Sequence, residues 1–440
     1  MSCHYRLGMG ALLLAVLAGT SGSLAILLYK LTELIPALHL LLYPNHLQEL
    51  SQVHARMMIF YCLQPALIVG FGNWFIPALI SSNRMLFPTV NTFAFLLLSI
   101  GFIFNFTTFF DQDPSLVITS LLLWSAGNLL FSIVVLITII NGRARGVAYS
   151  SLSFFVWGQV ISAFISLMII PIFLAVLTHL YMSPILISSA RLALVINQFI
   201  YPCMIILMVP ALSIVFNILS TLSSKPVRFK GWVVGLLGFV IINVVVCWQK
   251  KIFLEHFAQF HQHTRVGTLS ADLLYILFFL LQFYLLFKFV CGRLRFFTPV
   301  LWCIGFMVFM VIGWLYQGVT FSLEQIHSCL SYALLMSVFA GFYFWMGKII
   351  GRMYSENLGK CHFFITFIGS LFLSNLISLG KISIMIGVVF MCASLLAFIL
   401  VILNALRNNI HLPNNYWGRG AITPEWNLSS PLSLNKEIKL

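Results

Sequence analysis

The stretch HARMMIFYCLQPALIVGFGNWFIP, residues 54–77, is a long apolar segment with a histidine at its head, a proline in its middle and a GFGNW cluster near its end. About 20 such residues are enough to cross the hydrocarbon core of a bilayer. His54 would be unpaired inside this segment unless something occupied a ring nitrogen, and a metal ion could do so. The stretch therefore predicts a membrane-spanning helix with a candidate metal-ligating histidine.

The composition of the whole chain agrees with a membrane protein. Of 440 residues, 61% are hydrophobic and only 8% are charged, whereas soluble domains carry about 25% charged residues. Apolar runs long enough to span a bilayer occupy 8–29, 54–80, 92–110, 115–140, 151–179, 186–219, 231–248, 270–291, 298–317, 328–350, 362–379 and 382–404. We predict an all-α, polytopic fold of about twelve helices, a single domain over 1–440 with a cytoplasmic tail over 405–440.

The net charge of +14 would suggest a nucleic-acid partner in a soluble chain. Here the basic residues fall in short loops between spans, so we expect the lipid bilayer and no nucleic acid as a partner. With the N-terminus inside, one side of the membrane holds Arg84, Arg143, Arg145, Lys225, Arg228, Lys230, Arg293, Arg295, Lys348, Arg352 and Lys360. This distribution obeys the positive-inside rule and predicts that both termini are inside.

Two further features favour a chain without processing or covalent cofactor attachment. The opening MSCHYRLGMGALLLAVLAG resembles a signal peptide, but its apolar run continues to about residue 29, so we expect it to be the first span. The nine cysteines are scattered and include no CxxC pair or CxxCH heme-attachment site. We interpret them as apolar packing residues.

Three blocks of sequence carry a resemblance to a known family. They are the helix that begins at His54 with the following NRMLFPTVNTFAFLL, then GFYFWMGKIIGRMYSENLGKCHFFITFIG at 341–369, and YWGRGAITPEWNLSSP at 416–431. In this order they resemble subunit I of the heme-copper oxidases. The resemblance implies a twelve-helix membrane protein, in agreement with the count of apolar runs.

In that family, one helix supplies His to a low-spin heme and another carries an H-F-H sequence. The resemblance implies that His54 stands at the position of the first histidine ligand of the low-spin heme. Counting back from Trp345, it places the H-F-H sequence on Gln325, Ile326 and His327. Residues two apart on a helix point about 200° apart, so one can face the low-spin heme and the other a high-spin heme. His327 then keeps the low-spin ligand, while Gln325 stands at the high-spin position.

The copper ligands of the family have no counterparts here. Where the family has H-P-E-V-Y, this chain has YPCMI. The resemblance thus aligns Tyr201 with a copper ligand, Cys203 with the proton-delivering glutamate and Ile205 with the redox tyrosine. Its W-A-H-H-M-F sequence reads WQKKIF, which places Lys250 and Lys251 on the other two ligands. A protonated ammonium has no lone pair to donate, so we do not expect copper.

The resemblance also implies that the proton paths have changed. Arg84 stands at the aspartate that opens one path, and Gln282 at the lysine of the other. The paired arginines that hold the heme propionates have no counterpart in the shortened loop before the last span. Lys30 aligns with the arginine that approaches the low-spin heme.

Other interpretations of these residues remain open. His54 and His327 could be hydrogen-bonded membrane histidines without a metal. Lys250 and Lys251 could be interfacial lysines whose stems reach water, or one ammonium could fill the former copper volume. A loop at 254–265 with His256, His261 and His263 could be solvated or could bind a surface metal.

We interpret the chain as a degenerate subunit I that binds one low-spin heme, of unknown type, through His54 and His327 and at most transfers electrons. Possible partners are other oxidase subunits and an electron donor, cytochrome c or quinol, in a bacterial inner (cytoplasmic) membrane. One alternative is an active terminal oxidase or nitric-oxide-reductase-like enzyme with an unusual site built from Tyr201 and the loop histidines. Another is a heme-free assembly or regulatory partner of an oxidase.

Overall fold

Long helices make up almost all of the described chain. The computed structural model describes residues 2–35, 44–111, 113–183, 188–223, 296–317, 323–408 and 412–432, with isolated positions between 231 and 238. Of residues 33, 44–48, 201, 314–317 and 323–327 it describes the backbone alone. The helices are α1 (Cys3–Leu34), α3 (Pro44–Arg56), α4 (Phe71–Leu79), α5 (Pro88–Thr107), α6 (Pro114–Asn141), α7 (Phe154–Met182), α8 (Ser189–Leu222), α11 (Thr298–Gln317), α12 (Leu323–Ile350), α13 (Glu356–Leu373) and α14 (Lys381–Arg407).

The helix that contains the opening stretch runs without a break from α3 to α4 through two π-helical segments, η1 (Met57–Leu63) and η2 (Pro65–Gly70). Pro65 explains the departure from α-helical geometry, because proline lacks an N–H group and its ring clashes with the preceding turn. Nearly every residue from Met57 to Leu79 is buried. An apolar helix that is buried on all sides belongs at the centre of a bundle.

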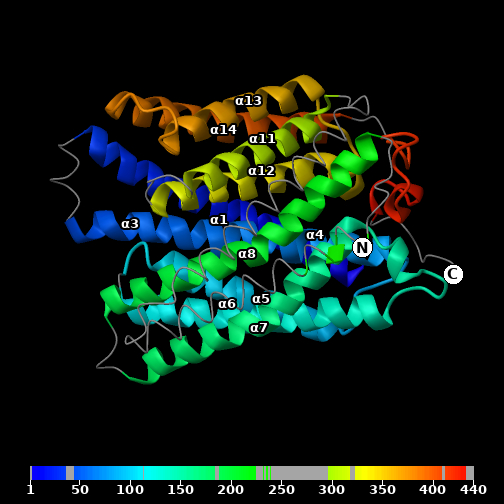
Figure 1. Cartoon of the computed structure of the whole chain (residues 1–440), viewed down its shortest axis with the longest axis horizontal. Coiled ribbons are helices and arrows are strands. Elements are labelled where there is room, and N and C mark those ends of the chain that lie inside the picture. The colour runs from blue at the N-terminus through cyan, green and yellow to red at the C-terminus, as the bar shows by residue number, and fades with distance from the viewer. Residues whose placement is uncertain are drawn as a thin grey trace.

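The other helices surround this central one (Figure 1). α1 packs against α3, η1, η2 and α4, while α5, α6, α7 and α8 pack in sequence, each against the next. α11, α12, α13 and α14 gather on the opposite side in the view of Figure 1, with α11 against α12 and α13 against α14. α12 also packs against α8 and η1. The central helix therefore lies between the two groups.

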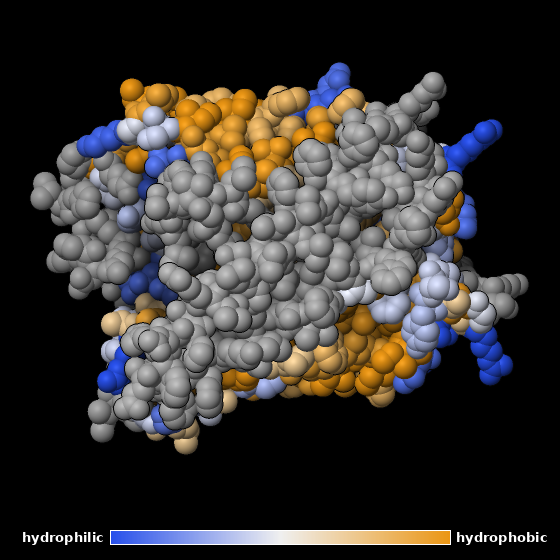
Figure 2. All heavy atoms as spheres, viewed as in Figure 1, coloured by the Kyte–Doolittle hydropathy of each residue, from blue (hydrophilic) through white to orange (hydrophobic). Residues whose placement is uncertain are grey.

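The outer helices present apolar side chains to their surroundings. Within the described residues, eight helices are long and apolar enough to cross a membrane. Only 17% of an apolar stretch of α14 and 28% of one of α5 is buried inside the protein. Figure 2 shows hydrophobic residues along the upper and lower parts of the visible face and hydrophilic ones toward its left and right ends. This surface is suited to lipid, and the chain is an all-α polytopic membrane protein.

The helices agree with the apolar runs of the sequence. Of the twelve runs, 231–248 and 270–291 lie almost wholly outside the described residues, and each of the others coincides with a helix. The run at 362–379 differs at both ends, because α13 begins earlier, at Glu356, and ends at Leu373. Asn375 follows with a positive φ of 59°, a left-handed conformation that breaks the helix.

The segment at 412–432, which the sequence suggests is part of a tail, packs against α12. Trp426 and Glu425 are fully buried, and Tyr416 and Trp417 both donate hydrogen bonds to the carbonyl oxygen of Phe344. Lys348, grouped by charge with loop residues, instead lies in α12 and is fully buried. The second and third blocks of the resemblance are therefore in contact.

Candidate functional site

His54 lies in the last turn of α3, where the central helix meets α1. Its Nδ1 donates a hydrogen bond to the carbonyl oxygen of Gly22, 2.9 Å away on α1. A Cβ at Gly22 would lie 3.0 Å from the Cβ of Met57, so glycine allows the two backbones to approach this closely. A neutral imidazole that donates from Nδ1 keeps the lone pair on Nε2. Nε2 makes no hydrogen bond to the described residues, which is the arrangement of a metal-binding histidine held by a backbone carbonyl.

The second predicted ligand, His327, lies in the first turns of α12. Its side chain and that of Gln325 are outside the described residues, but the register of the two helices can be compared. Phe75 stacks on Trp345 with ring centroids 4.3 Å apart, and Phe71 lies 3.0 Å from the position of a Cβ at Gly341. Residue numbers rise together in these contacts, so the central helix and α12 are parallel.

This register places the two histidines at similar depths. Phe71 is 17 residues after His54, or about 26 Å at the α-helical rise, and Gly341 is 14 residues after His327, or about 21 Å. The π-helical turns of the central helix hold more residues per turn, so its rise per residue is smaller than that of an α-helix. The two lengths therefore differ by less than these values suggest.

Lys30, the third predicted heme-contacting residue, lies on α1 two turns after Gly22. Its Nζ is 5.1 Å from the ring centroid of Tyr29. α1 runs antiparallel to the central helix, because Gly8 lies beside Trp74, Gly19 beside Cys62 and Gly22 beside Met57. Lys30 therefore lies toward the same end of the bundle as His54. It is about 12 Å further along α1 than Gly22.

α8 carries the three positions that the resemblance places in the copper and proton-delivery region of the family. Cys203 is fully buried and Ile205 is half-buried, while only the backbone of Tyr201 is described. Lys250, Lys251 and Gln282 lie outside the described residues, as do His256, His261 and His263. In the part of the chain that the structure describes, no group of three or more His, Cys, Asp or Glu side chains is close enough to hold a metal.

Arg84 lies in the exposed loop between α4 and α5, where its carbonyl oxygen accepts a hydrogen bond from Ser82. Near this end of the bundle, Asn91 Nδ2 donates to Asn73 Oδ1 over 2.6 Å, and both side chains are buried. Asn73 belongs to the GFGNW cluster, and Asn91 to the block that follows. The sequence did not reveal this contact, although buried amides in apolar spans require partners and were the available signal.

Side chains from neighbouring helices also bind the backbone of the central helix. Trp124 Nε1 donates to Phe60 O and Gln159 Nε2 donates to Leu67 O, both over 2.8 Å. Gln64 donates to Asn128 in a further buried contact. These hydrogen bonds fix the π-helical segments that follow His54.

The C-terminal segment buries one of its own carboxyl groups against the other end of α12. Glu425 is fully buried, and this burial raises its pKa to about 7, although the positive charge of Lys348 opposes the shift. Lys348 Nζ donates to the carbonyl oxygen of Leu428 over 2.6 Å. Glu425 and Lys348 are far along α12 from His327, so they do not belong to the candidate heme site.

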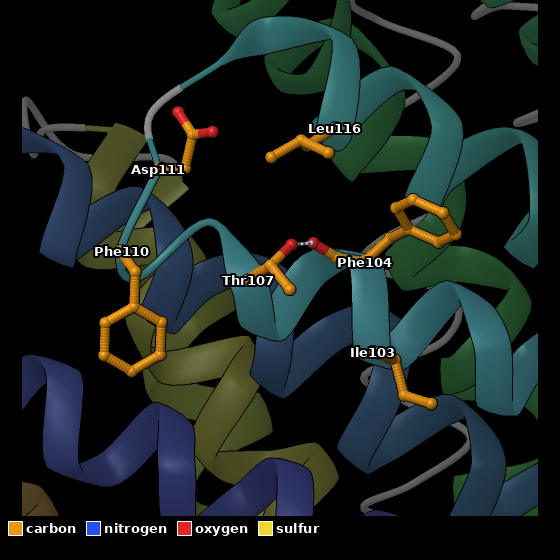
Figure 3. A pocket seen from close by; sticks show the side chains of 6 residues that line it. All are labelled: Ile103, Phe104, Thr107, Phe110, Asp111 and Leu116. Carbon is orange, nitrogen blue, oxygen red and sulfur yellow. Dashed lines mark hydrogen bonds between the residues drawn. The ribbon is translucent and has the colours of Figure 1, made fainter.

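A surface cavity of about 320 Å³ lies between the end of α5 and the start of α6 (Figure 3). Thr107 donates its hydroxyl to Phe104 O in its own helix, and Asp111 accepts a hydrogen bond from the backbone N–H of Asp113. Phe110 and Ile103 are apolar and exposed. The polar groups of this cavity have local partners, so we assign no chemistry to it.

The geometry defines an all-α polytopic membrane protein in which a neighbouring backbone holds a histidine on the central helix. The chain belongs to the family described as Cytochrome C and Quinol oxidase polypeptide I, subunit I of the heme-copper oxidases, which matches residues 6–385. It is 24% identical to cytochrome c oxidase subunit 1 of Cereibacter sphaeroides, over 86% of this chain and 78% of that protein. It is 27% identical to cytochrome c oxidase subunit 1 of Yarrowia lipolytica, over 72% and 67% of the two chains.

Proposed function

We propose that this protein is a degenerate heme-copper oxidase subunit I that binds one low-spin heme through His54 and His327. The observation that carries the proposal is the hydrogen bond from His54 Nδ1 to Gly22 O, which leaves Nε2 free to bind iron. The parallel packing of the central helix and α12 supports it, because this packing puts the two histidines at similar depths.

The residues present are suited to a heme but not to a heme-copper centre. A bound heme would supply a one-electron couple between ferric and ferrous iron. Two imidazole ligands would leave no open coordination site for dioxygen. Tyr201, Lys250 and Lys251 stand where the family has its copper ligands, and Gln325 stands where it has the high-spin heme ligand. We therefore propose electron transfer at most, without reduction of dioxygen or proton pumping.

The same reasoning extends to the surroundings of the protein. As a subunit I homologue it would assemble with other oxidase-type subunits and take electrons from cytochrome c or a quinol. We place it in a bacterial inner membrane with both termini inside, because the basic residues of the sequence are concentrated in loops on one side of the membrane. Lys30 would lie near the heme edge and contribute a positive charge there.

The test is a reduced-minus-oxidised absorption spectrum of the purified full-length protein, together with heme and copper analysis. We expect one low-spin heme per chain and no copper. Two hemes with stoichiometric copper would favour an active oxidase with an unusual site. A protein free of heme after expression with abundant heme would favour an assembly or regulatory partner.

A further inference from the structure

Arg56 is a charged residue inside the span that also contains His54, yet it is only 3% exposed. It lies two residues after His54, so it points to a different side of the central helix. Nε donates to Asn105 Oδ1 over 3.1 Å, and Nη2 donates to Thr108 Oγ1 over 3.3 Å. Both partners are neutral, so these contacts orient the guanidinium without balancing its charge.

The third nitrogen, Nη1, has no hydrogen-bond acceptor among the described residues. Glu49, seven residues earlier on the same helix, attracts the guanidinium electrostatically but forms no hydrogen bond or ion pair with it among the described residues. A buried cation without a close anion is costly, because little solvent remains to stabilise its charge. An arginine in this state is a candidate for an anionic ligand.

A cavity of about 70 Å³ lies beside Arg56, between the central helix and α8. Its polar lining consists of Arg56, Gln52 and Asn197, and its apolar lining includes Phe60, Ile196 and Ile200. The amides of Gln52 and Asn197 make no hydrogen bonds to the described residues, so their N–H groups are available as donors. The cavity thus combines one cation, two neutral donors and an apolar wall.

We propose that Arg56, Gln52 and Asn197 bind the anionic head group, a carboxylate or a phosphate, of a membrane amphiphile. Guanidinium and amide donors match the oxygens of such a group. The volume is sufficient for a head group of a few atoms, and the apolar residues beside it suit the start of an acyl chain. Asn105 lies two residues before the end of α5, and Asn197 lies in the third turn of α8, so the cavity is near one membrane surface.

The experiment is a thermal unfolding titration of the purified full-length protein in a neutral detergent, at constant ionic strength. Sodium laurate is the probe, and sodium acetate is the same carboxylate without a chain. We expect laurate to raise the unfolding midpoint in a saturable manner and acetate to have a much smaller effect. In Arg56→Gln the apparent affinity for laurate should fall at least about tenfold, or about 1.4 kcal/mol, while Arg56→Lys retains part of it.

Two further variants make the result independent of any folding defect in Arg56→Gln. Arg191→Gln, which removes an exposed arginine at the start of α8, should titrate as the wild type does. Ala193→Leu places a larger side chain at the cavity wall and leaves Arg56 intact, so it should also weaken laurate binding. Heme content, measured on the same samples, should be the same in variants whose affinity for laurate differs.

A comparison of nanodiscs separates the sources of the head group. Phosphatidylcholine with phosphatidylglycerol should stabilise the wild type more than phosphatidylcholine alone if a phospholipid is bound, whereas equal stability with a laurate response indicates a free fatty acid. The proposal is overturned if laurate stabilises wild type and Arg56→Gln equally, if it stabilises neither, or if acetate acts as strongly as laurate.

Discussion

The indole N–H of Trp124 on α6 donates to the carbonyl oxygen of Phe60, 2.8 Å away in the first π-helical segment. Gln64 N–H bonds to Ile59 O, five residues earlier, and the next residue, Pro65, has no N–H to offer to Phe60 O. The widened turn thus leaves one carbonyl without a helical donor, and Trp124 supplies the missing one. This hydrogen bond stabilises the π-helical geometry just beyond His54.

Replacing Trp124 with phenylalanine should therefore leave a buried carbonyl unsatisfied. We expect Trp124→Phe to lower the free energy of unfolding by about 1–3 kcal/mol, measured by thermal or denaturant unfolding in detergent. Trp157→Phe is the matched control, because Trp157 is half-buried and its N–H makes no hydrogen bond to the described residues. Equal losses in the two variants would mean that ring volume, and not the hydrogen bond, is responsible.

Gly22 controls how closely α1 approaches His54. A Cβ there would lie 3.0 Å from the Cβ of Met57, so Gly22→Ala should push α1 away and weaken the hydrogen bond to His54 Nδ1. We expect this variant to retain less heme than wild type after purification, with a destabilisation of roughly 1–3 kcal/mol. Thr20→Ala serves as the control, because Thr20 is exposed and bonds only to its own helix. Unchanged heme retention in Gly22→Ala would contradict the role given to this contact.

The raised pKa of the buried Glu425 carboxyl group predicts that stability depends on pH. Its folded pKa is about 7, above the ordinary value of 4.5, so the folded state holds this proton more tightly than the unfolded state does. The free energy of unfolding should then fall as pH rises from about 4.5 to about 7 and level off above that range. Glu425→Gln, which is neutral throughout, should flatten this part of the profile.

The measurement is the unfolding midpoint between pH 4.5 and 8 for wild type, Glu425→Gln and the exposed-carboxylate control Asp111→Asn. The control should keep the wild-type slope. A slope that persists unchanged in Glu425→Gln would show that other groups produce it.

Oxygen chemistry should be absent. In the proposed alignment with the family, Tyr201, Lys250, Lys251 and Gln325 stand at the four ligand positions of the oxygen-reducing centre. Cys203, Ile205, Arg84 and Gln282 stand at positions that would supply protons and electrons. Restoring histidine at the four ligand positions should at most allow metal to bind. Oxygen reduction should still be absent, because the proton paths would stay changed. Oxygen uptake with an artificial donor is the measurement, and sustained, cyanide-sensitive consumption by the unmodified chain would contradict the expectation.

The apolar runs predicted the membrane helices because length and composition alone decide whether a segment can cross a bilayer. The place of His54 on the central helix followed from the same run, but its contact with Gly22 did not, because the two residues are 32 positions apart in sequence. Contacts of this kind depend on which helices become neighbours.

Other features arise only from tertiary packing. The charge pattern placed Lys348 with loop residues, whereas the C-terminal segment covers it and buries Glu425 beside it. Arg56 sits within the quoted stretch, yet its direction toward Asn105 and away from the Gly22 contact could not be derived from spacing. A charged residue within an apolar span was the available signal, since such residues have a function by default.

The most direct test of the heme assignment compares reduced-minus-oxidised spectra of wild type, His54→Ala, His327→Ala and Gln325→Ala. We expect the low-spin signal to be lost, or to become that of five-coordinate heme, in both histidine variants and to stay nearly unchanged in Gln325→Ala. Equal damage from Gln325→Ala, or a low-spin signal that survives the loss of either histidine, would contradict bis-histidine ligation by His54 and His327.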